Sequence, residues 1–249
     1  AKAKIAPGTY RKITGNEALA LGLVAAARWG WVLVLYGLGG MAGAVLYTLP
    51  PVRAAYRPFG GEAVAFACIW GCVTGAYVLQ RGTLSGAAAL VGIAYASSCV
   101  AMLMMHHYLD RGPDSRAFPP KTTTIVLLGR PGRRYAVAWA AIALAGAALL
   151  AARADAAFAV LAALLAVALL LHATVDPDDP AGVTRAELGV IVAGMAGGLG
   201  TAALLAPPLA WALVAAAVLV PLELALSGVA HRDLAAERAR LARARVGPG

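Results

Sequence analysis

Two aspartates at the end of a long apolar stretch offer the clearest chemistry in the sequence. Asp110 and Asp114 belong to the segment HHYLDRGPD, at residues 106–114. Residues four apart on a helical end project from one face, so their carboxylates could share a divalent cation. Magnesium prefers few carboxylates together with phosphate oxygens, which makes a phosphorylated ligand its natural partner. The spacing alone also allows two solvated or helix-capping aspartates.

Basic residues in the polar segments could neutralise the remaining charge of a diphosphate. They are Lys121, Arg111, Arg116 and Arg57. His106 and His107 open a second interpretation, because imidazole and carboxylate ligands also suit a transition metal. Adjacent residues on a helix point about 100° apart, so at most one histidine joins the aspartates easily. We therefore rank magnesium above a transition metal.

The elements that position these residues are predicted to be transmembrane helices. The chain of 249 residues is 61% hydrophobic and only 13% charged, and its mean hydropathy of +0.76 excludes an ordinary soluble domain. Nearly all its apolar stretches suit the roughly 17 to 25 residues of one membrane span. They cover residues 17–49, 62–80, 84–106, 136–152, 155–173, 186–206 and 208–229. They lack the alternation of β-strands, so we predict an all-α polytopic transmembrane helix bundle.

The stretch 17–49 decides the number of passes. If it forms a hairpin that turns near residues 28–30, most lysines and arginines fall on one side of the membrane. The positive-inside rule then predicts about eight spans with both termini cytoplasmic, in the inner (plasma) membrane. The net charge of +9 records this orientation and does not indicate a nucleic-acid partner. We expect a transmembrane domain at 1–230 and a basic amphipathic tail at 231–249 that lies on anionic lipid.

A second aspartate-rich segment, DPDDP at 176–180, follows a later apolar stretch. Its prolines favour an extended loop, and its aspartates lack the spacing of four, so we interpret it as a solvated turn. Residues 184–187 have the sequence TRAE, which predicts a capping box at the start of the next helix.

Four motifs follow one another along the chain. The first is RKITG followed by EAL at 11–19, and the second is YTLPPVR followed by YR and GE at 47–62. The third is GAYVLQRGTLS at 75–85, and the fourth is DRGPD followed by KT and LG at 110–129. In this order they resemble the UbiA-type intramembrane prenyltransferases, most closely the 1,4-dihydroxy-2-naphthoate prenyltransferases of menaquinone synthesis.

The chain departs from the pattern of that family in two respects. The sequence begins downstream of the place where the first aspartate motif and the first two helices of the family are expected. In the second aspartate motif, two asparagines and an arginine of the family are replaced by His106, His107 and Leu109. The polar groups before Asp110 are therefore imidazoles where the family has amides.

The resemblance implies a site and a reaction. Asp110, Asp114 and Lys121 would be catalytic, and the two aspartates would hold Mg²⁺. The residues implied to bind the diphosphate are Arg11, Lys12, Arg53, Tyr56, Arg57 and Arg116. A prenyl diphosphate would ionise, and an electron-rich aromatic acceptor would attack the carbocation in a cavity that the helices keep dry. Membrane lipid would surround the bundle.

Two alternatives from other functional classes remain open. A UbiA-like protein that no longer catalyses could serve as a structural or quinone- or lipid-binding subunit, with protein partners in a larger membrane complex. A transporter is favoured least, because the sequence shows neither an inverted repeat nor paired broken helices.

Overall fold

The computed structural model describes residues 20, 22–24, 27, 30–118, 120–211, 215, 219 and 222. The long helices are α2 (Trp31–Thr48), α3 (Gly60–Arg81), α4 (Gly86–Arg116), α6 (Gly132–Arg153), α7 (Phe158–Thr174) and α8 (Pro180–Leu205). The short ones are η1 (Ala54–Tyr56), α5 (Thr124–Leu128) and η2 (Pro207–Leu209). These described residues contain no β-strand, which confirms the all-α prediction. The chain divides into two compact units, residues 1–197 and 198–249, and the first carries all the sites below.

In the part of the chain that the structure describes, five helices are long and apolar enough to cross a membrane, namely α2, α3, α4, α6 and α8. Helix α7 is equally apolar in character but has 17 residues, the lower limit of the roughly 17 to 25 that a span needs. These six elements coincide with six of the eight predicted passes. The predicted crossings at 17–30 and 208–229, and the tail at 231–249, lie wholly or mostly outside the described residues.

Helix α2 begins directly after the predicted turn at residues 28–30. Gly30 has a φ of 85°, a backbone conformation that side chains disfavour and that does not continue a right-handed helix. The helix therefore starts at Trp31 and cannot extend unbroken across the whole apolar stretch 17–49. The hairpin itself stays a prediction, because its first arm is largely undescribed.

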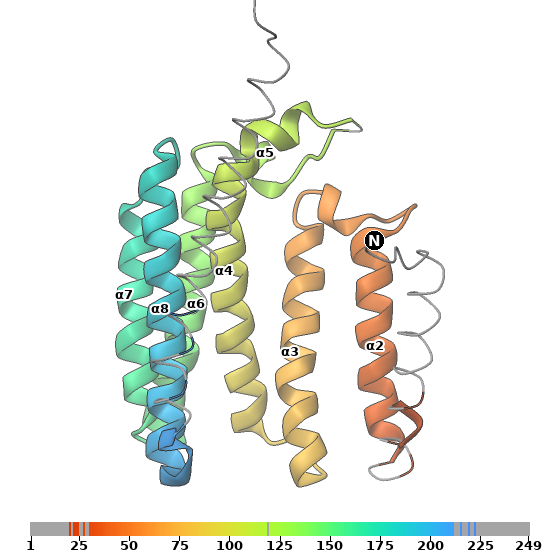
Figure 1. The fold of residues 1–249 in the computed structure, drawn as a ribbon, viewed down its shortest axis with the longest axis vertical. Coiled ribbons are helices and arrows are strands. Elements are labelled where there is room, and N and C mark those ends of the chain that lie inside the picture. The colour runs from red at the N-terminus through yellow and green to blue at the C-terminus, as the bar shows by residue number, and fades with distance from the viewer. Residues whose placement is uncertain are drawn as a thin grey trace, which may run out of the picture. The chain divides into compact units, whose positions relative to one another are not determined.

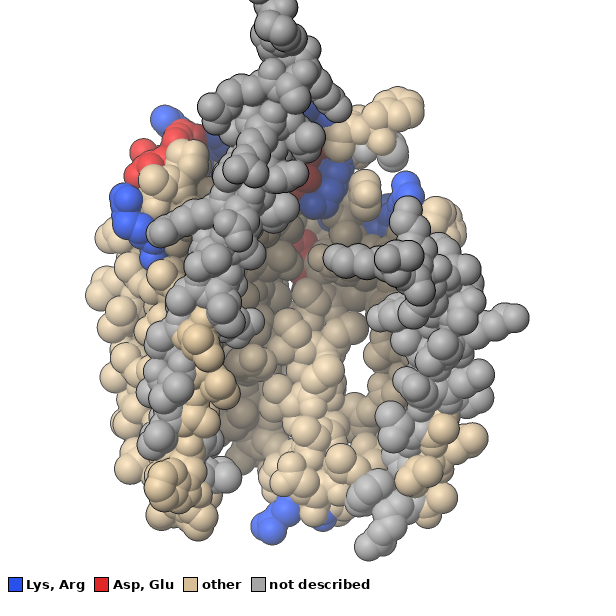
Figure 2. Space-filling view, in the orientation of Figure 1, with Lys and Arg blue, Asp and Glu red and all other residues tan. Residues whose placement is uncertain are grey.

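The helices of the first unit run alternately up and down (Figure 1). Helix α2 packs against α3, α3 against α4, α4 against α6, and α6 against α7. As a result, the connections 49–59, 117–131 and 175–179 lie at one end of this unit, which we call the polar end. Most of the Lys and Arg side chains that the structure describes gather there (Figure 2), while Arg81 and Arg153 end α3 and α6 at the opposite side. This asymmetry follows the predicted charge pattern.

Small residues allow α4 to approach its neighbours closely. A Cβ added to Gly146 of α6 would lie 3.1 Å from the Cβ of Ala94, and one added to Gly92 would lie 2.8 Å from Cδ1 of Trp70 on α3. Fully buried alanines of α4 and α6 extend this contact, among them Ala96 and Ala147. In lipid, such close backbone packing replaces the hydrophobic effect as the main source of helix association.

We expect Gly146→Leu to destabilise the packing of α4 against α6. The added side chain must displace the Ala94 backbone, whose Cα lies 3.5 Å from the built Cβ, and overpacking of this kind costs about 1–3 kcal/mol. The matched control is Gly40→Leu on α2, where an added Cβ meets no described atom within 4 Å. Thermal unfolding in detergent measures both variants, and equal midpoints for the two would contradict the packing described.

Candidate functional site

The C-terminal end of α4 carries the predicted aspartate motif. Helix α4 has 31 residues and runs through Pro113 to Arg116. At about 1.5 Å per residue it is about 46 Å long, well beyond a hydrocarbon core of about 30 Å. The motif therefore lies on a helical end that extends past the core, as the spacing of Asp110 and Asp114 predicts. Residues 107–116 continue α4, and α5 occupies part of the connection that follows.

Lys121 meets the second aspartate of the motif. Its Nζ lies 2.9 Å from Oδ2 of Asp114, and the two side chains are only 23% and 13% exposed. The backbone reinforces the contact, since the N–H groups of Lys121 and Ala117 both donate to the Asp114 carbonyl, at 3.1 Å and 3.3 Å. The structure thus brings together two of the three predicted catalytic residues, 7 positions apart in the sequence, in a largely buried ion pair.

Asp110 is the more accessible aspartate, with a side chain 40% exposed. Its Oδ2 lies 3.7 Å from Nε2 of His106. Nδ1 of the same ring lies 3.2 Å from Oε1 of Glu187 on α8. His106 therefore stands between two carboxylates, whereas His107 is buried and its Nδ1 has no hydrogen-bond partner.

The connection between α2 and α3 presents the second group of predicted ligands at the polar end. Arg53 lies with its guanidinium carbon 5.1 Å from the centroid of the Tyr56 ring. Arg57 donates from an Nη to the Pro51 carbonyl at 2.9 Å and is otherwise exposed. Arg116, in contrast, donates to the Gly112 carbonyl of its own helix at 3.1 Å.

Two residues of this connection adopt the left-handed backbone conformation, Arg53 with a φ of 45° and Phe59 with a φ of 60°. For residues other than glycine this costs about 1–3 kcal/mol each, and such residues cluster at functional sites. The Nε of Arg53 is also buried without a hydrogen-bond partner. The connection therefore holds an arginine in a fixed and incompletely satisfied position, which suits an anion ligand.

Phe59 fastens this connection to the segment that follows Lys121. Its N–H donates to Oγ1 of Thr124 at 2.7 Å, and its ring packs edge-on against Tyr135 with centroids 5.6 Å apart. Within the described residues, no hydrogen bond or ion pair joins Arg53 or Arg57 directly to the aspartates. Arg11 and Lys12, the remaining predicted ligands, lie outside the described residues.

The connection between α7 and α8 contributes a residue that the sequence did not reveal. Asp178 binds Arg111 at 2.5 Å and Arg130 at 2.9 Å. First the Arg111 guanidinium, and then that of Arg130, hold the pKa of Asp178 below its ordinary value. Asp178 lies in an exposed turn, as predicted, but the prediction did not include its two ion pairs. Arg111 is occupied by an acid of the chain instead of being free for a diphosphate.

The prediction of a capping box at 184–187 is wrong. Helix α8 already begins at Pro180, a residue whose fixed φ and missing N–H suit the first helical position. The Ala181 N–H is bonded by Oδ1 of Asp179 at 3.1 Å. Thr184 donates from its hydroxyl to the Pro180 carbonyl at 2.9 Å, as a residue inside the first turns does.

Glu62 is the most deeply buried carboxylate of the described residues, with 2% exposure. It lies in the first turn of α3, where the positive end of the helix dipole favours a negative charge. Its Oε1 has no hydrogen-bond partner. Burying a polar group without a full set of hydrogen-bond partners costs free energy. In the sequence, Glu62 was singled out only by its place in the GE motif of the second segment.

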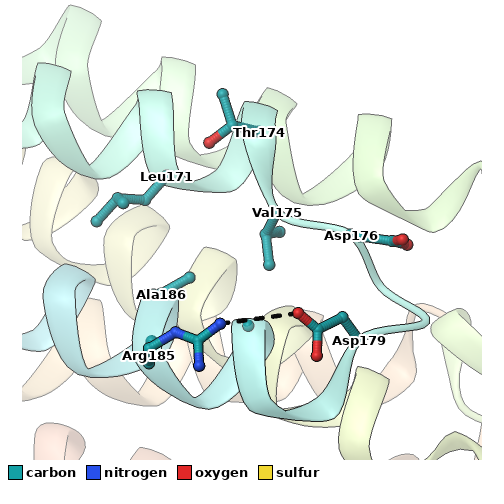
Figure 3. A pocket seen from close by; sticks show the side chains of 8 residues that line it. Leu171, Thr174, Val175, Asp176, Asp179, Arg185 and Ala186 are labelled. Atoms are coloured by element: carbon teal, nitrogen blue, oxygen red, sulfur yellow. Dashed lines mark ion pairs between the residues drawn. The ribbon is translucent and has the colours of Figure 1, made fainter.

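An open depression of about 410 Å³ lies between the facing ends of α7 and α8. Leu171, Val175 and Ala186 form apolar walls, and Arg185 approaches Asp179 at 3.9 Å (Figure 3). None of its lining residues was predicted to belong to the site. The depression is therefore separate from the aspartates of α4.

The carboxylates at the end of α4 are suited to a magnesium ion that is held together with a phosphorylated ligand. Among the described residues, no group of three or more His, Cys, Asp and Glu side chains is placed to hold a metal ion. Transition-metal sites normally need several such protein ligands. Magnesium needs only one or two carboxylates when phosphate oxygens and water supply the rest. Asp110 and Asp114 fit that second pattern.

The fold and the site define a class of protein: a polytopic helical membrane protein with an aspartate and arginine site at one end of its apolar helices. Comparison with known families makes the class definite, because the UbiA prenyltransferase family matches residues 12–188. The chain belongs to this family, and membership implies membrane prenyltransferase activity in general. No curated protein and no solved structure matches the chain.

Proposed function

We propose that this protein transfers a prenyl group from a prenyl diphosphate to an aromatic acceptor resembling 1,4-dihydroxy-2-naphthoate, as in menaquinone synthesis. The observation that carries the proposal is the pairing of Asp114 with Lys121 at 2.9 Å beside Asp110 on the extended end of α4. Two carboxylates next to a lysine, at the polar end of an apolar helix bundle, suit a substrate with a diphosphate head and an isoprenoid tail.

The proposed reaction begins with the allylic C–O bond of the prenyl diphosphate. The bond breaks, its electron pair leaves with the diphosphate, and an allylic carbocation remains. An electron-rich ring carbon of the acceptor forms the new C–C bond, and the ring loses a proton to become aromatic again. Magnesium, when bound by Asp110 and Asp114 with the diphosphate, would neutralise charge on the leaving group.

The chain's own cations have distinct parts in this reaction. Lys121 keeps the Asp114 carboxylate in place, and it would stabilise the diphosphate oxygens that acquire charge. Arg53 and Arg57 project from the α2–α3 connection, and we assign them to the diphosphate. Tyr56 fixes Arg53 by stacking. Arg116 and the undescribed Arg11 and Lys12 complete the proposed set.

The proposed topology places the polar end in the cytoplasm of a cell with this protein in its plasma membrane. Most of the described lysines and arginines gather at that end (Figure 2), and the positive-inside rule assigns such an end to the cytoplasm. Both termini would then be cytoplasmic, where prenyl diphosphates and soluble aromatic acids are available to the site.

The acceptor and the metal are tested together with purified protein in lipid vesicles. We expect prenyl transfer to 1,4-dihydroxy-2-naphthoate in the presence of Mg²⁺, loss of transfer on chelation with EDTA, and recovery on adding Mg²⁺ back. A parallel assay with 4-hydroxybenzoate shows whether the acceptor class is correct. Transfer to 4-hydroxybenzoate alone would overturn the naphthoate assignment, and transfer that survives EDTA would overturn the role of the metal.

A further inference from the structure

The end of α4 that carries the aspartates is intrinsically weak as a helix. Pro113 lies between Asp110 and Asp114 and lies inside the helix. A proline has no N–H to donate to the carbonyl four residues earlier, and its ring crowds that carbonyl, so an interior proline costs about 3 kcal/mol. The relative position of the two carboxylates depends on the turn that this proline weakens.

Contacts within the helix restrain the end only locally. Ser115 donates from its hydroxyl, and Arg116 from Nε, to the Gly112 carbonyl at 2.9 Å and 3.1 Å. Both bonds run from residues after Pro113 back to the carbonyl of the residue before it, so they tie the last turn of α4 only to the turn that precedes it. These bonds do not fix how the end of α4 lies against the neighbouring connections, which depends on contacts with other elements.

The α7–α8 connection supplies such contacts through one side chain. One carboxylate oxygen of Asp178 accepts from Arg111 on α4, and the other accepts from Nε of Arg130 in the connection that leads to α6. Asp178 itself is fixed, because its N–H donates to Oδ1 of Asp176 at 3.0 Å. Asp178 thus joins the α7–α8 connection to two other segments, through Arg111, 67 positions earlier in the sequence, and Arg130, 48 positions earlier.

Two further contacts join neighbouring parts of the polar end. Arg133 at the start of α6 donates to the Val175 carbonyl at 3.3 Å. His106 on α4 meets Glu187 on α8 at 3.2 Å. A single exposed ion pair contributes only about 0–1 kcal/mol. A carboxylate shared by two guanidiniums, with further contacts beside it, forms a network. Such a network restrains the end of α4 more strongly than one exposed ion pair does.

We propose that Asp178 is a positioning residue for the aspartate motif. By holding Arg111 and Arg130 together, it fixes the end of α4 on which Asp110 and Asp114 flank Pro113. It also keeps the Arg111 guanidinium away from its neighbour Asp110, whose carboxylate then stays available to a cation. The second part of this inference rests on the proposed function, while the structural part does not.

Asp178→Asn tests the structural part without any assay of activity. The variant keeps the size of the side chain but leaves two guanidiniums without their counterion. We expect amide hydrogens of residues 107–118 to exchange roughly tenfold faster, which corresponds to about 1.4 kcal/mol in the free energy of opening. Peptides from α3 should be unchanged. The matched control is Asp176→Asn, which removes the same charge from the same connection and retains an oxygen for the Asp178 N–H.

The functional part is tested with the same variants in the transfer assay. Mispositioned reacting groups cost on the order of 10- to 100-fold in rate, and we expect the Mg²⁺ concentration for half-maximal rate to rise roughly tenfold as well. A mere loss of folded protein would lower the rate and leave that concentration unchanged. Asp178→Glu, which keeps a carboxylate, should recover much of both quantities.

The outcomes separate this inference from the proposed function. Faster exchange at 107–118 in Asp178→Asn but not in Asp176→Asn supports the positioning role, even if the wild-type protein transfers no prenyl group. Unchanged exchange overturns it. Faster exchange with an unchanged Mg²⁺ requirement in an active protein overturns the link between Asp178 and the cation site.

Discussion

Asp110→Ala is expected to lower kcat for prenyl transfer by on the order of 10² to 10³, the effect of removing one group that stabilises developing charge. Its side chain is 40% exposed, and among the described residues its ion-pair partner is His106, at 3.7 Å. Stability should therefore change little, since exposed pairs of this kind contribute about 0–1 kcal/mol. Initial rates of transfer in lipid vesicles, with thermal unfolding as a second measurement, check both expectations.

The control for Asp110→Ala is Asp155→Asn. Asp155 lies between α6 and α7, at the end of the first unit opposite to the aspartate motif, and its Oδ1 accepts from the Ala157 N–H at 2.8 Å. The asparagine keeps that acceptor, so neither rate nor stability should change. Equal rates for wild type and Asp110→Ala would remove Asp110 from the active site.

Lys121→Met is expected to lower both stability and activity, because it leaves the Asp114 carboxylate without its cation. The pair is mostly buried, with side chains 23% and 13% exposed. Its loss should cost about 1–3 kcal/mol, between the values for exposed and for fully buried pairs. Transfer should fall on the order of 10²-fold, as the removal of a charge-stabilising group predicts.

The double variant Asp114→Asn with Lys121→Met separates the two effects. Without the carboxylate there is no unpaired buried charge, so the double variant should recover most of the stability that Lys121→Met loses. It should remain inactive, because both predicted catalytic groups are gone. If the changes in unfolding midpoint of the two single variants simply add up in the double variant, the ion pair is contradicted. An active double variant would contradict the role of the pair in catalysis.

Much of the fold could be predicted from the sequence because hydrocarbon imposes a simple rule on it. Helices alone satisfy their backbone polar groups in lipid, so apolar stretches of the right length became helices α3, α4, α6, α7 and α8. The ends of the helices were predicted less accurately. Helix α4 continues ten residues past the end of its apolar stretch at 106, through Pro113, because packing and polar contacts outside the lipid core outweigh the local preference of a proline.

The candidate site was predictable only where its residues are neighbours in the sequence. Asp110 and Asp114 share a helix face because they are four apart, and Lys121 follows closely enough to pair with Asp114. Asp178 could not be found this way, since it meets Arg111 across 67 residues. No local pattern specifies that contact, and the chain must first bring α4 beside the α7–α8 connection. The buried state of Glu62 is likewise a consequence of tertiary packing.

The most direct measurement is the yield of both products from one reaction with the 249-residue protein in lipid vesicles. An allylic prenyl diphosphate and 1,4-dihydroxy-2-naphthoate are supplied with Mg²⁺, and the prenylated ring and the released diphosphate are quantified together. We predict equal molar amounts of the two, and neither above the background of empty vesicles when Asp110 and Asp114 are both replaced by alanine. The proposed function is contradicted if the double replacement leaves diphosphate release unchanged. It is also contradicted if the wild type releases no diphosphate, a result that favours a non-catalytic lipid- or quinone-binding protein.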